Sequence, residues 1–185
     1  QNKWLQLVMG YCGDKYKVFM VFILMAAYNI RSIEQLKNIR QREAGLVLGI
    51  KRVPSKLRVR RWLHEVSEKK ISAQLLKNFF RYQLRAGLVG MWLWFTDGHL
   101  LPYTGKEKVH AGYSTQRRMP IAGRTNLVTS DSSGRIVDFE IQEGKGDLRG
   151  YILNLNKRWQ DELIEAPVQV FDREGYASEF FHSLL

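Results

Sequence analysis

Two aspartates each close a hydrophobic run that has the composition of a β-strand. Asp97 closes Met-Trp-Leu-Trp-Phe-Thr-Asp, and Asp172 closes Pro-Val-Gln-Val-Phe-Asp. If the two strands are neighbours, their carboxylates can share one sheet edge and provide the hard oxygen ligands that Mg²⁺ or Mn²⁺ prefers. A single aspartate after a strand is more often a turn residue or a helix cap. The relative position of the two strands therefore decides what chemistry this pair can do.

The elements around these aspartates predict that they lie side by side. We expect a fully apolar, central strand over 89–95, a loop over 100–123, a hairpin of strands 124–129 and 135–142, a helix from the cap Asp147 to about 163, a strand over 167–171 and a helix from Ser178. In this β-β-β-α-β-α order a helix precedes the fourth strand. Such a crossover normally returns parallel, beside the first strand.

The first 85 residues have helical patterning. We expect helices over 14–29, from the cap Ser32, over 41–48, over 55–67 and over 72–85. The short third helix, a turn containing Gly49 and a basic fourth helix resemble a helix-turn-helix, although an ordinary helical bundle with a basic surface is an equal alternative. The apolar run 18–28 is 11 residues long, whereas a membrane span needs about 20, so a buried helix is the better prediction.

Positive charge is concentrated in the helical half. The chain has a net charge of +11, and residues 1–90 contain 18 Lys and Arg against 5 Asp and Glu, whereas 91–185 contain 11 against 13. Such a basic block is typical of a surface that binds a polyanion, and phosphate contacts supply most non-specific affinity for DNA. The candidate DNA-binding residues are Lys56, Arg58, Arg60 and Arg61, then Lys106, Lys108, Arg117, Arg118, Arg124 and Arg173.

Several other classes of protein and site are disfavoured. A single cysteine, Cys12, allows neither a disulfide framework nor a cysteine-based zinc site and suits a reducing cytosol. His99, His110 and His182 lack metal-ligand spacing. The motif Gly144-Lys-Gly146 is not a P-loop, because the GxxxxGK[ST] pattern is absent, so we expect no nucleotide cofactor.

Four segments of the second half resemble bacterial insertion-sequence transposases of the DDE type. They are 96–108 (Thr-Asp-Gly-His-Leu-Leu-Pro-Tyr-Thr-Gly-Lys-Glu-Lys), 112–120, 139–148 and 170–176 (Val-Phe-Asp-Arg-Glu-Gly-Tyr). Residues 32–36 and 48–54 are also similar to the N-terminal region of those proteins. The resemblance covers nearly the whole chain and is most specific over 95–176.

The resemblance implies an α/β fold with a ribonuclease-H-like mixed sheet, here incomplete, preceded by an all-α region. The implied domains are a helical, basic, DNA-binding region over 1–87 and a catalytic domain over 88–185. Asp97 corresponds to the family's first acid and Asp172 to its second. The third acid lies on a helix beyond a fifth strand, so we expect this chain to be truncated before it. Glu140 and Glu143 are the nearest substitutes.

The function implied by the resemblance is metal-dependent DNA strand cleavage and strand transfer at the ends of an insertion sequence, with two Mg²⁺ or Mn²⁺ ions. The expected partners are double-stranded DNA, both element ends and target, and further copies of the chain, but no membrane; the expected location is the bacterial cytoplasm, at the nucleoid. A catalytically inactive truncated transposase that acts as a DNA-binding protein or inhibitor is the alternative, and a stand-alone nuclease of the same fold is weaker.

Most of Trp92, Trp94, Phe95, Phe171, Phe180 and Phe181 are expected in the core.

Overall fold

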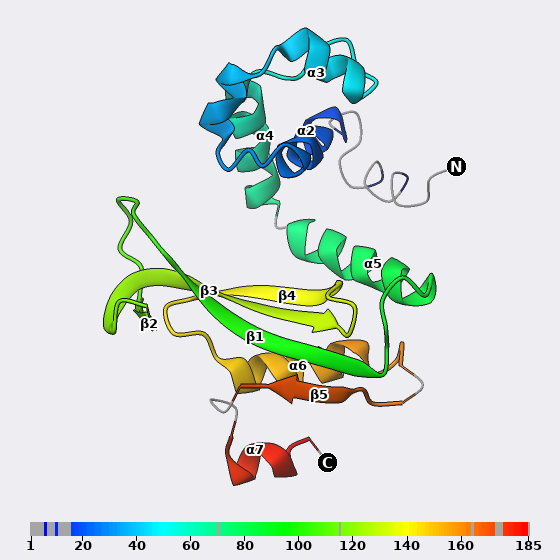
Figure 1. The fold of residues 1–185 in the computed structure, drawn as a ribbon, viewed down its shortest axis with the longest axis vertical. Coiled ribbons are helices and arrows are strands. Elements are labelled where there is room, and N and C mark those ends of the chain that lie inside the picture. The colour runs from blue at the N-terminus through cyan, green and yellow to red at the C-terminus, as the bar shows by residue number, and fades with distance from the viewer. Residues whose placement is uncertain are drawn as a thin grey trace. The chain divides into compact units, whose positions relative to one another are not determined.

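The computed structural model describes residues 6, 10, 16–69, 71–114, 116–163, 165–172 and 176–184. The chain forms two compact units, Gln1–Phe79 and Phe80–Leu185. The first unit contains helices, and the second contains a sheet with helices (Figure 1). The expected cap Asp14, the cysteine Cys12 and the candidate DNA contact Arg173 lie outside the described residues.

The first unit is helical, as its patterning predicts. Its helices are α2 (Tyr16–Ala27), the 3₁₀ helix η2 (Ile33–Asn38), α3 (Gln41–Val47), α4 (Lys56–Glu68) and the start of α5 (Ile71–Arg85). Their apolar stripes meet in one core, in which the side chains of Val21, Val59 and Trp62 are almost completely buried. Most of the run 18–28 lies in α2, but only one face of this helix is buried, and Ile23 and Tyr28 are exposed. No helix within the described residues is long and apolar enough to cross a membrane.

Local sequence determines where these helices begin and end. Ser32 and Gln35 form the capping box expected at Ser32, but the helix that follows has 3₁₀ geometry. Gly49 ends α3 with a φ of +66°, a conformation that suits glycine. Gly45 lets the next segment pass closely, because a Cβ at that position would lie 2.7 Å from Arg52 Cα.

The second unit is an α/β domain with a five-stranded mixed sheet. Its strands are β1 (Leu93–Pro102), β2 (Ala111–Ser114), β3 (Met119–Asp131), β4 (Ile136–Glu143) and β5 (Val168–Phe171). β3 pairs antiparallel with β1, β2 and β4, and β5 pairs parallel with β1 on its other side. The hairpin, the central position of β1 and the parallel return of β5 are confirmed.

The segment expected to be a loop over 100–123 contains parts of three strands. β1 starts at Leu93 rather than at residue 89 and runs on to Pro102, and the start of β3 pairs with the unpredicted strand β2. The prediction is wrong because Gly105, Gly112 and Pro120 are residue types that usually mark loops. Gly112 instead packs against Gly144, since a Cβ on it would lie 2.9 Å from the Gly144 carbonyl oxygen.

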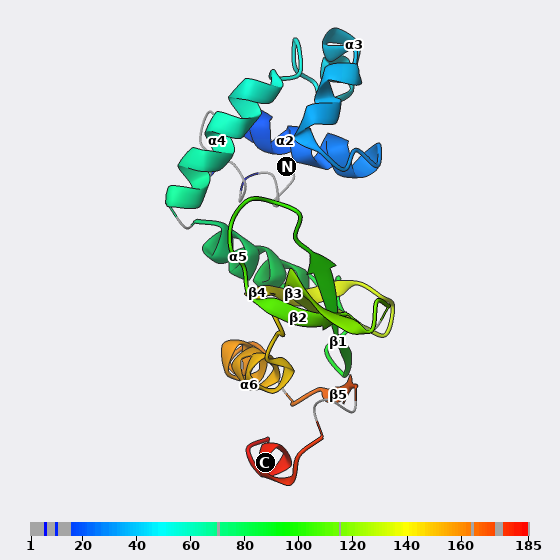
Figure 2. The ribbon, with the colours of Figure 1, turned by 90° about the vertical axis from the view of Figure 1, so that its left-hand side faces the viewer.

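Helices cover the sheet from opposite sides. Figure 2 shows α6 (Leu148–Trp159) on one side of the sheet. Asp138 in β4 accepts hydrogen bonds from Arg158 and Trp159 of this helix, so its side chain faces it. The next residue, Phe139, points the other way and meets Phe80 of α5 edge to face, with 6.1 Å between ring centroids. The cap Asp147 is confirmed, because its Oδ1 accepts a hydrogen bond from the Gly150 N–H.

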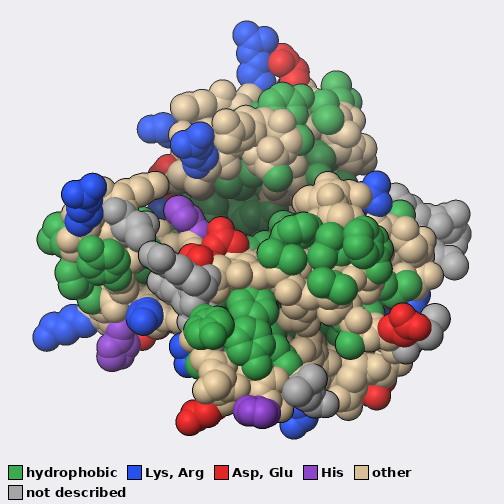
Figure 3. Space-filling view, turned by 60° about the horizontal axis from the view of Figure 1, so that its bottom comes forward, with side chains coloured by type: hydrophobic (Ala, Val, Ile, Leu, Met, Phe, Trp, Pro, Cys, Tyr) green, Lys and Arg blue, Asp and Glu red, His purple; other side chains and the backbone are tan. Residues whose placement is uncertain are grey.

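Only part of the expected aromatic core is buried. Trp94 is fully buried, and Phe180 in α7 (Ser178–His182) is nearly so, but Trp92, Phe95 and Phe181 are 66%, 41% and 41% exposed. The apolar sequence of β1 predicts that both of its faces are covered. The Trp94 and Thr96 face of β1 lies toward α6, because Thr96 contacts Thr129, which contacts Tyr151 of that helix. The opposite face carries the exposed Phe95. Figure 3 shows that hydrophobic side chains also gather in places on the face of the molecule that it views.

Candidate functional site

Asp97 and Asp172 lie at equivalent positions of neighbouring strands. In the parallel pair of β1 and β5, Phe95 is opposite Val170 and Thr96 is opposite Phe171. Each aspartate comes two residues after the partners Phe95 and Val170. Asp172 directly follows the last residue of β5, as expected, but Asp97 lies within β1, opposite Val128 of β3, because β1 continues to Pro102 instead of ending at the aspartate. Both side chains are exposed. The sequence-based prediction that the strands bring these two acids together is met by this geometry.

The two aspartates line one depression with a volume of about 450 Å³. Its charged, polar and aromatic lining includes Asp97, His99, Tyr113, Arg117, Lys145 and Asp172. Within it, the Asp97 Oδ1 accepts the backbone N–H of Gly98 at 2.8 Å, which fixes one oxygen of that carboxylate. Acidic oxygens and cationic side chains therefore line one open depression.

The donor set is suited to a hard divalent cation but contains few protein ligands. Carboxylate oxygens and water are the ligands that Mg²⁺ prefers, and Mg²⁺ is commonly held by one or two carboxylates plus substrate phosphates. Among the described residues, no group of three or more His, Cys, Asp or Glu side chains could hold a metal ion. Asp97 and Asp172 are thus the residues that could hold such a cation, with water or substrate oxygens completing its coordination.

Glu140 and Glu143, the suggested substitutes for a third acid, have other partners. Glu140 Oε2 lies 3.3 Å from the Arg158 guanidinium and its Oε1 accepts a hydrogen bond from Gln142. Glu143 lies 3.9 Å from His110. Neither glutamate lines the depression that contains Asp97 and Asp172.

The basic residues expected near the acids fall into two groups. Arg117 lines the depression, whereas Lys106, Lys108 and Arg118 are exposed and do not line it. Arg124 lies 3.8 Å from Glu107, and its guanidinium is 5.6 Å from the ring centroid of Tyr103. Only part of the predicted cationic cluster therefore accompanies the acids.

Sequence reasoning missed Lys145, which lines the depression with Arg117. The motif Gly144-Lys-Gly146 does not match the P-loop pattern, but this mismatch does not exclude another role for Lys145. A lysine between two glycines, placed between a strand and a helix cap, is nevertheless a detectable pattern, since glycine allows a turn to pack closely on neighbouring backbone.

The four cations of α4 also differ in their environment. Lys56 Nζ lies 2.9 Å from Glu34, and Arg60 pairs with the same carboxylate. The hydrogen bond from Lys56, followed by the nearby charge of Arg60, lowers the pKa of Glu34 against the opposing effect of desolvation. Arg58 and Arg61 are exposed, one helical turn apart, and make no ion pair within residues 16–69. Of the four cations of α4 that were predicted to bind DNA, Arg58 and Arg61 are therefore the two that remain available to an anion.

The most deeply buried carboxylate of the sheet is structural. Burial raises the pKa of Asp138, although Arg158, the Trp159 indole N–H and the Phe139 backbone N–H favour its charged form. Its Oδ2 accepts hydrogen bonds from Arg158 and Trp159, each at 2.9 Å. These contacts fasten β4 to α6, away from the depression, so we assign Asp138 no chemical role.

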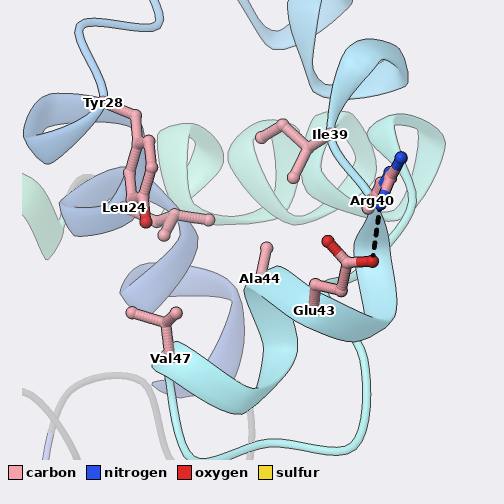
Figure 4. A pocket seen from close by; sticks show the side chains of 7 residues that line it. All are labelled: Leu24, Tyr28, Ile39, Arg40, Glu43, Ala44 and Val47. Atoms are coloured by element: carbon pink, nitrogen blue, oxygen red, sulfur yellow. Dashed lines mark hydrogen bonds and ion pairs between the residues drawn. The ribbon is translucent and has the colours of Figure 1, made fainter.

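The helical unit has a smaller pocket of about 240 Å³ with little chemical potential. Figure 4 shows it between α2 and α3, with apolar side chains around it. Its only charged lining residues are Arg40 and Glu43, which pair with each other at 3.0 Å. This pairing leaves neither side chain available to a ligand without first breaking the contact.

Comparison of the chain with protein-family models, with curated proteins and with solved structures gave no match.

Proposed function

We propose that this protein is a transposase-like, DNA-processing protein of the DDE type, with a ribonuclease-H-like domain that cleaves and transfers DNA strands. The observation that carries the proposal is the parallel pairing of β1 with β5, which brings Asp97 and Asp172 to one depression. The strand order β4-β3-β1-β5, with β3 antiparallel to its neighbours, supports the ribonuclease-H-like assignment.

Asp97 and Asp172 would hold one or two Mg²⁺ or Mn²⁺ ions. When bound, such ions lower the pKa of the attacking water or 3′-hydroxyl and stabilise the leaving oxygen of a phosphodiester. The contribution of the protein is to place two carboxylates on adjacent strands, where the hydrogen-bonded backbone limits their movement. Gly98, through its N–H to Asp97 Oδ1, orients the first of them.

Double-stranded DNA is the proposed substrate and partner. The helical unit supplies Arg58 and Arg61, whose exposed guanidinium groups are not neutralised within residues 16–69. Binding through phosphates is independent of base sequence and depends strongly on salt. This substrate places the protein in the bacterial cytoplasm, at the nucleoid.

A second candidate function is DNA binding without catalysis, as in an inhibitory transposase derivative. It is favoured by the fact that the described residues bring no third carboxylate to Asp97 and Asp172. The two candidates share the DNA-binding surface and differ in whether metal ions at the acid pair cleave a phosphodiester.

The test of the proposal combines metal binding with cleavage. Isothermal titration with Mn²⁺ should show binding that Asp97→Asn and Asp172→Asn each weaken at least tenfold, and both variants should lose Mg²⁺-dependent nicking of a labelled DNA duplex while still binding it. Asp161→Asn is the matched control, because Asp161 is an exposed aspartate after α6 that lies outside the depression. Metal binding without nicking would leave the non-catalytic candidate. Wild-type nicking by either acid variant would refute the catalytic assignment.

A further inference from the structure

The depression that holds Asp97 and Asp172 has a second, basic side built from connections between strands. Arg117 lies in the connection from β2 to β3, and Lys145 lies in the connection from β4 to α6. In the sheet β5 and β1 are neighbours, whereas β2 and β4 both pair with β3 on its far side from β1. Asp97 and Asp172 thus belong to β1 and the end of β5, on one side of β3. Arg117 and Lys145 lie in connections of β2 and β4, which pair with β3 on its other side.

The backbone on both sides of Lys145 is fastened to β3. The Gly144 N–H donates to the Gly123 carbonyl at 2.9 Å, and the Gly144 carbonyl accepts from the Thr125 hydroxyl at 2.6 Å. After the lysine, the Gly146 N–H donates to the same Thr125 oxygen at 3.2 Å. Lys145 is therefore an exposed side chain on a positioned turn.

Both glycines beside Lys145 are required by this packing. Gly144 has a φ of +71°, and a Cβ on it would lie 2.9 Å from the Cβ of His110. A Cβ on Gly146 would lie 2.8 Å from Thr125 Cγ2. The glycines of Gly144-Lys-Gly146, which is not a P-loop, thus allow the backbone around the lysine to pack closely on β3 at Gly123 and Thr125.

Lys145 and Arg117 have no ion pair among the residues that the structure describes, unlike Arg124 and Arg158. Arg124 is paired with Glu107, and Arg158 is paired with Asp138 and Glu140. A cation without a carboxylate partner, held at a depression, can accept an anion without first breaking an internal contact.

We propose that Lys145 and Arg117 bind backbone phosphates of the DNA strand that enters this depression, next to the phosphodiester presented to Asp97 and Asp172. The proposal rests on the proposed function for the identity of the substrate. It adds a specific phosphate-binding role for Lys145 and separates Arg117 from Arg124, whose charge is used within the protein.

The test is the salt dependence of DNA binding by the full chain. Anisotropy of a fluorescein-labelled DNA duplex, titrated in metal-free buffer at several KCl concentrations, gives the slope of log K against log[salt]. Lys145→Ala and Arg117→Ala should each make that slope shallower by about one, because each variant binds one phosphate fewer. Lys145→Arg should restore it.

Arg124→Ala is the matched control, since it removes one exposed positive charge of the same region that already has a carboxylate partner. Its slope should equal that of the wild type. Wild-type slopes for both Lys145→Ala and Arg117→Ala, in variants with wild-type circular dichroism, would overturn the inference even if Mn²⁺ binding at Asp97 were found. Shallower slopes in a protein that binds no Mn²⁺ would instead sustain the phosphate site and reject the proposed metal chemistry.

Discussion

Asp97 and Asp172 follow opposed residues of two parallel strands by the same number of positions, and both line one depression. The opposed residues are Phe95 and Val170. Two like charges in one depression repel each other, and a divalent cation between them would remove this repulsion. The relationship therefore predicts that a cation stabilises the folded domain.

Adding Mg²⁺ or Mn²⁺ should raise the melting temperature of the wild-type protein, and EDTA should reverse the change. A ligand that binds only the folded state adds RT ln(1 + [L]/Kd), about 2.7 kcal/mol when its concentration is about 100 times Kd. Differential scanning fluorimetry should show no metal-dependent shift for Asp97→Asn, whereas Asp161→Asn should behave like the wild type. An equal shift in all three proteins would mean that the cation binds elsewhere.

Acid should weaken the second unit partly through Glu162. Its carboxylate accepts hydrogen bonds from Arg85 and from Arg81, at 2.8 and 2.6 Å, and these lower its pKa below the usual 4.5 against the opposing desolvation. Because the unfolded chain then binds its proton more tightly, the stabilisation is present above the unfolded pKa and is lost as pH falls through the folded pKa. Glu162→Gln should cost about 1–2 kcal/mol at neutral pH.

The measurement is urea unfolding of wild type and Glu162→Gln at neutral pH and at several acidic values. The two curves of unfolding free energy should approach each other as pH falls. Some acid sensitivity should remain in the variant, because Asp131 also has a lowered pKa: the N–H groups of Gly90, Arg135 and Ser133 outweigh the opposing effect of its burial. A constant difference between wild type and variant at all pH values would show that the carboxylate charge does not contribute.

The sequence predicted the parts of the fold that depend on local patterns and on chain topology. Asp147 as a cap, the hairpin over β3 and β4, and the parallel return of β5 follow from turn residues and from the preference of a helical crossover for a parallel strand. The proximity of Asp97 and Asp172 followed from the last of these. Ion pairing could not be predicted in this way, because Glu34 is 22 residues from Lys56 in the chain and meets it only after η2 packs on α4.

The sequence also could not predict which face of β1 is buried, because both faces of this strand carry apolar residues. Trp94 is fully buried and donates its indole N–H to the Gly90 carbonyl, whereas the adjacent Phe95 is 41% exposed. Trp94→Ala should destabilise the domain by about 3–5 kcal/mol, the usual cost of truncating a core aromatic residue. Phe95→Ala should cost about 1 kcal/mol, since much of its side chain is already in water.

Urea unfolding monitored by circular dichroism gives both values from one series. A loss of stability for Phe95→Ala as large as that for Trp94→Ala would mean that the second face of β1 is covered in solution.

The four cations of α4 should contribute unequally to DNA binding. Arg58 and Arg61 are exposed and unpaired within residues 16–69, whereas Lys56 and Arg60 share the carboxylate of Glu34. Arg58→Ala with Arg61→Ala should make the slope of log K against log[salt] shallower by about two, one for each phosphate that the double variant no longer binds. Lys56→Ala with Arg60→Ala removes the same formal charge but should change that slope much less. Equal slopes for the two double variants would show that net charge, rather than the unpaired face of α4, governs binding, and this unit would then act as a diffuse basic surface instead of a recognition helix.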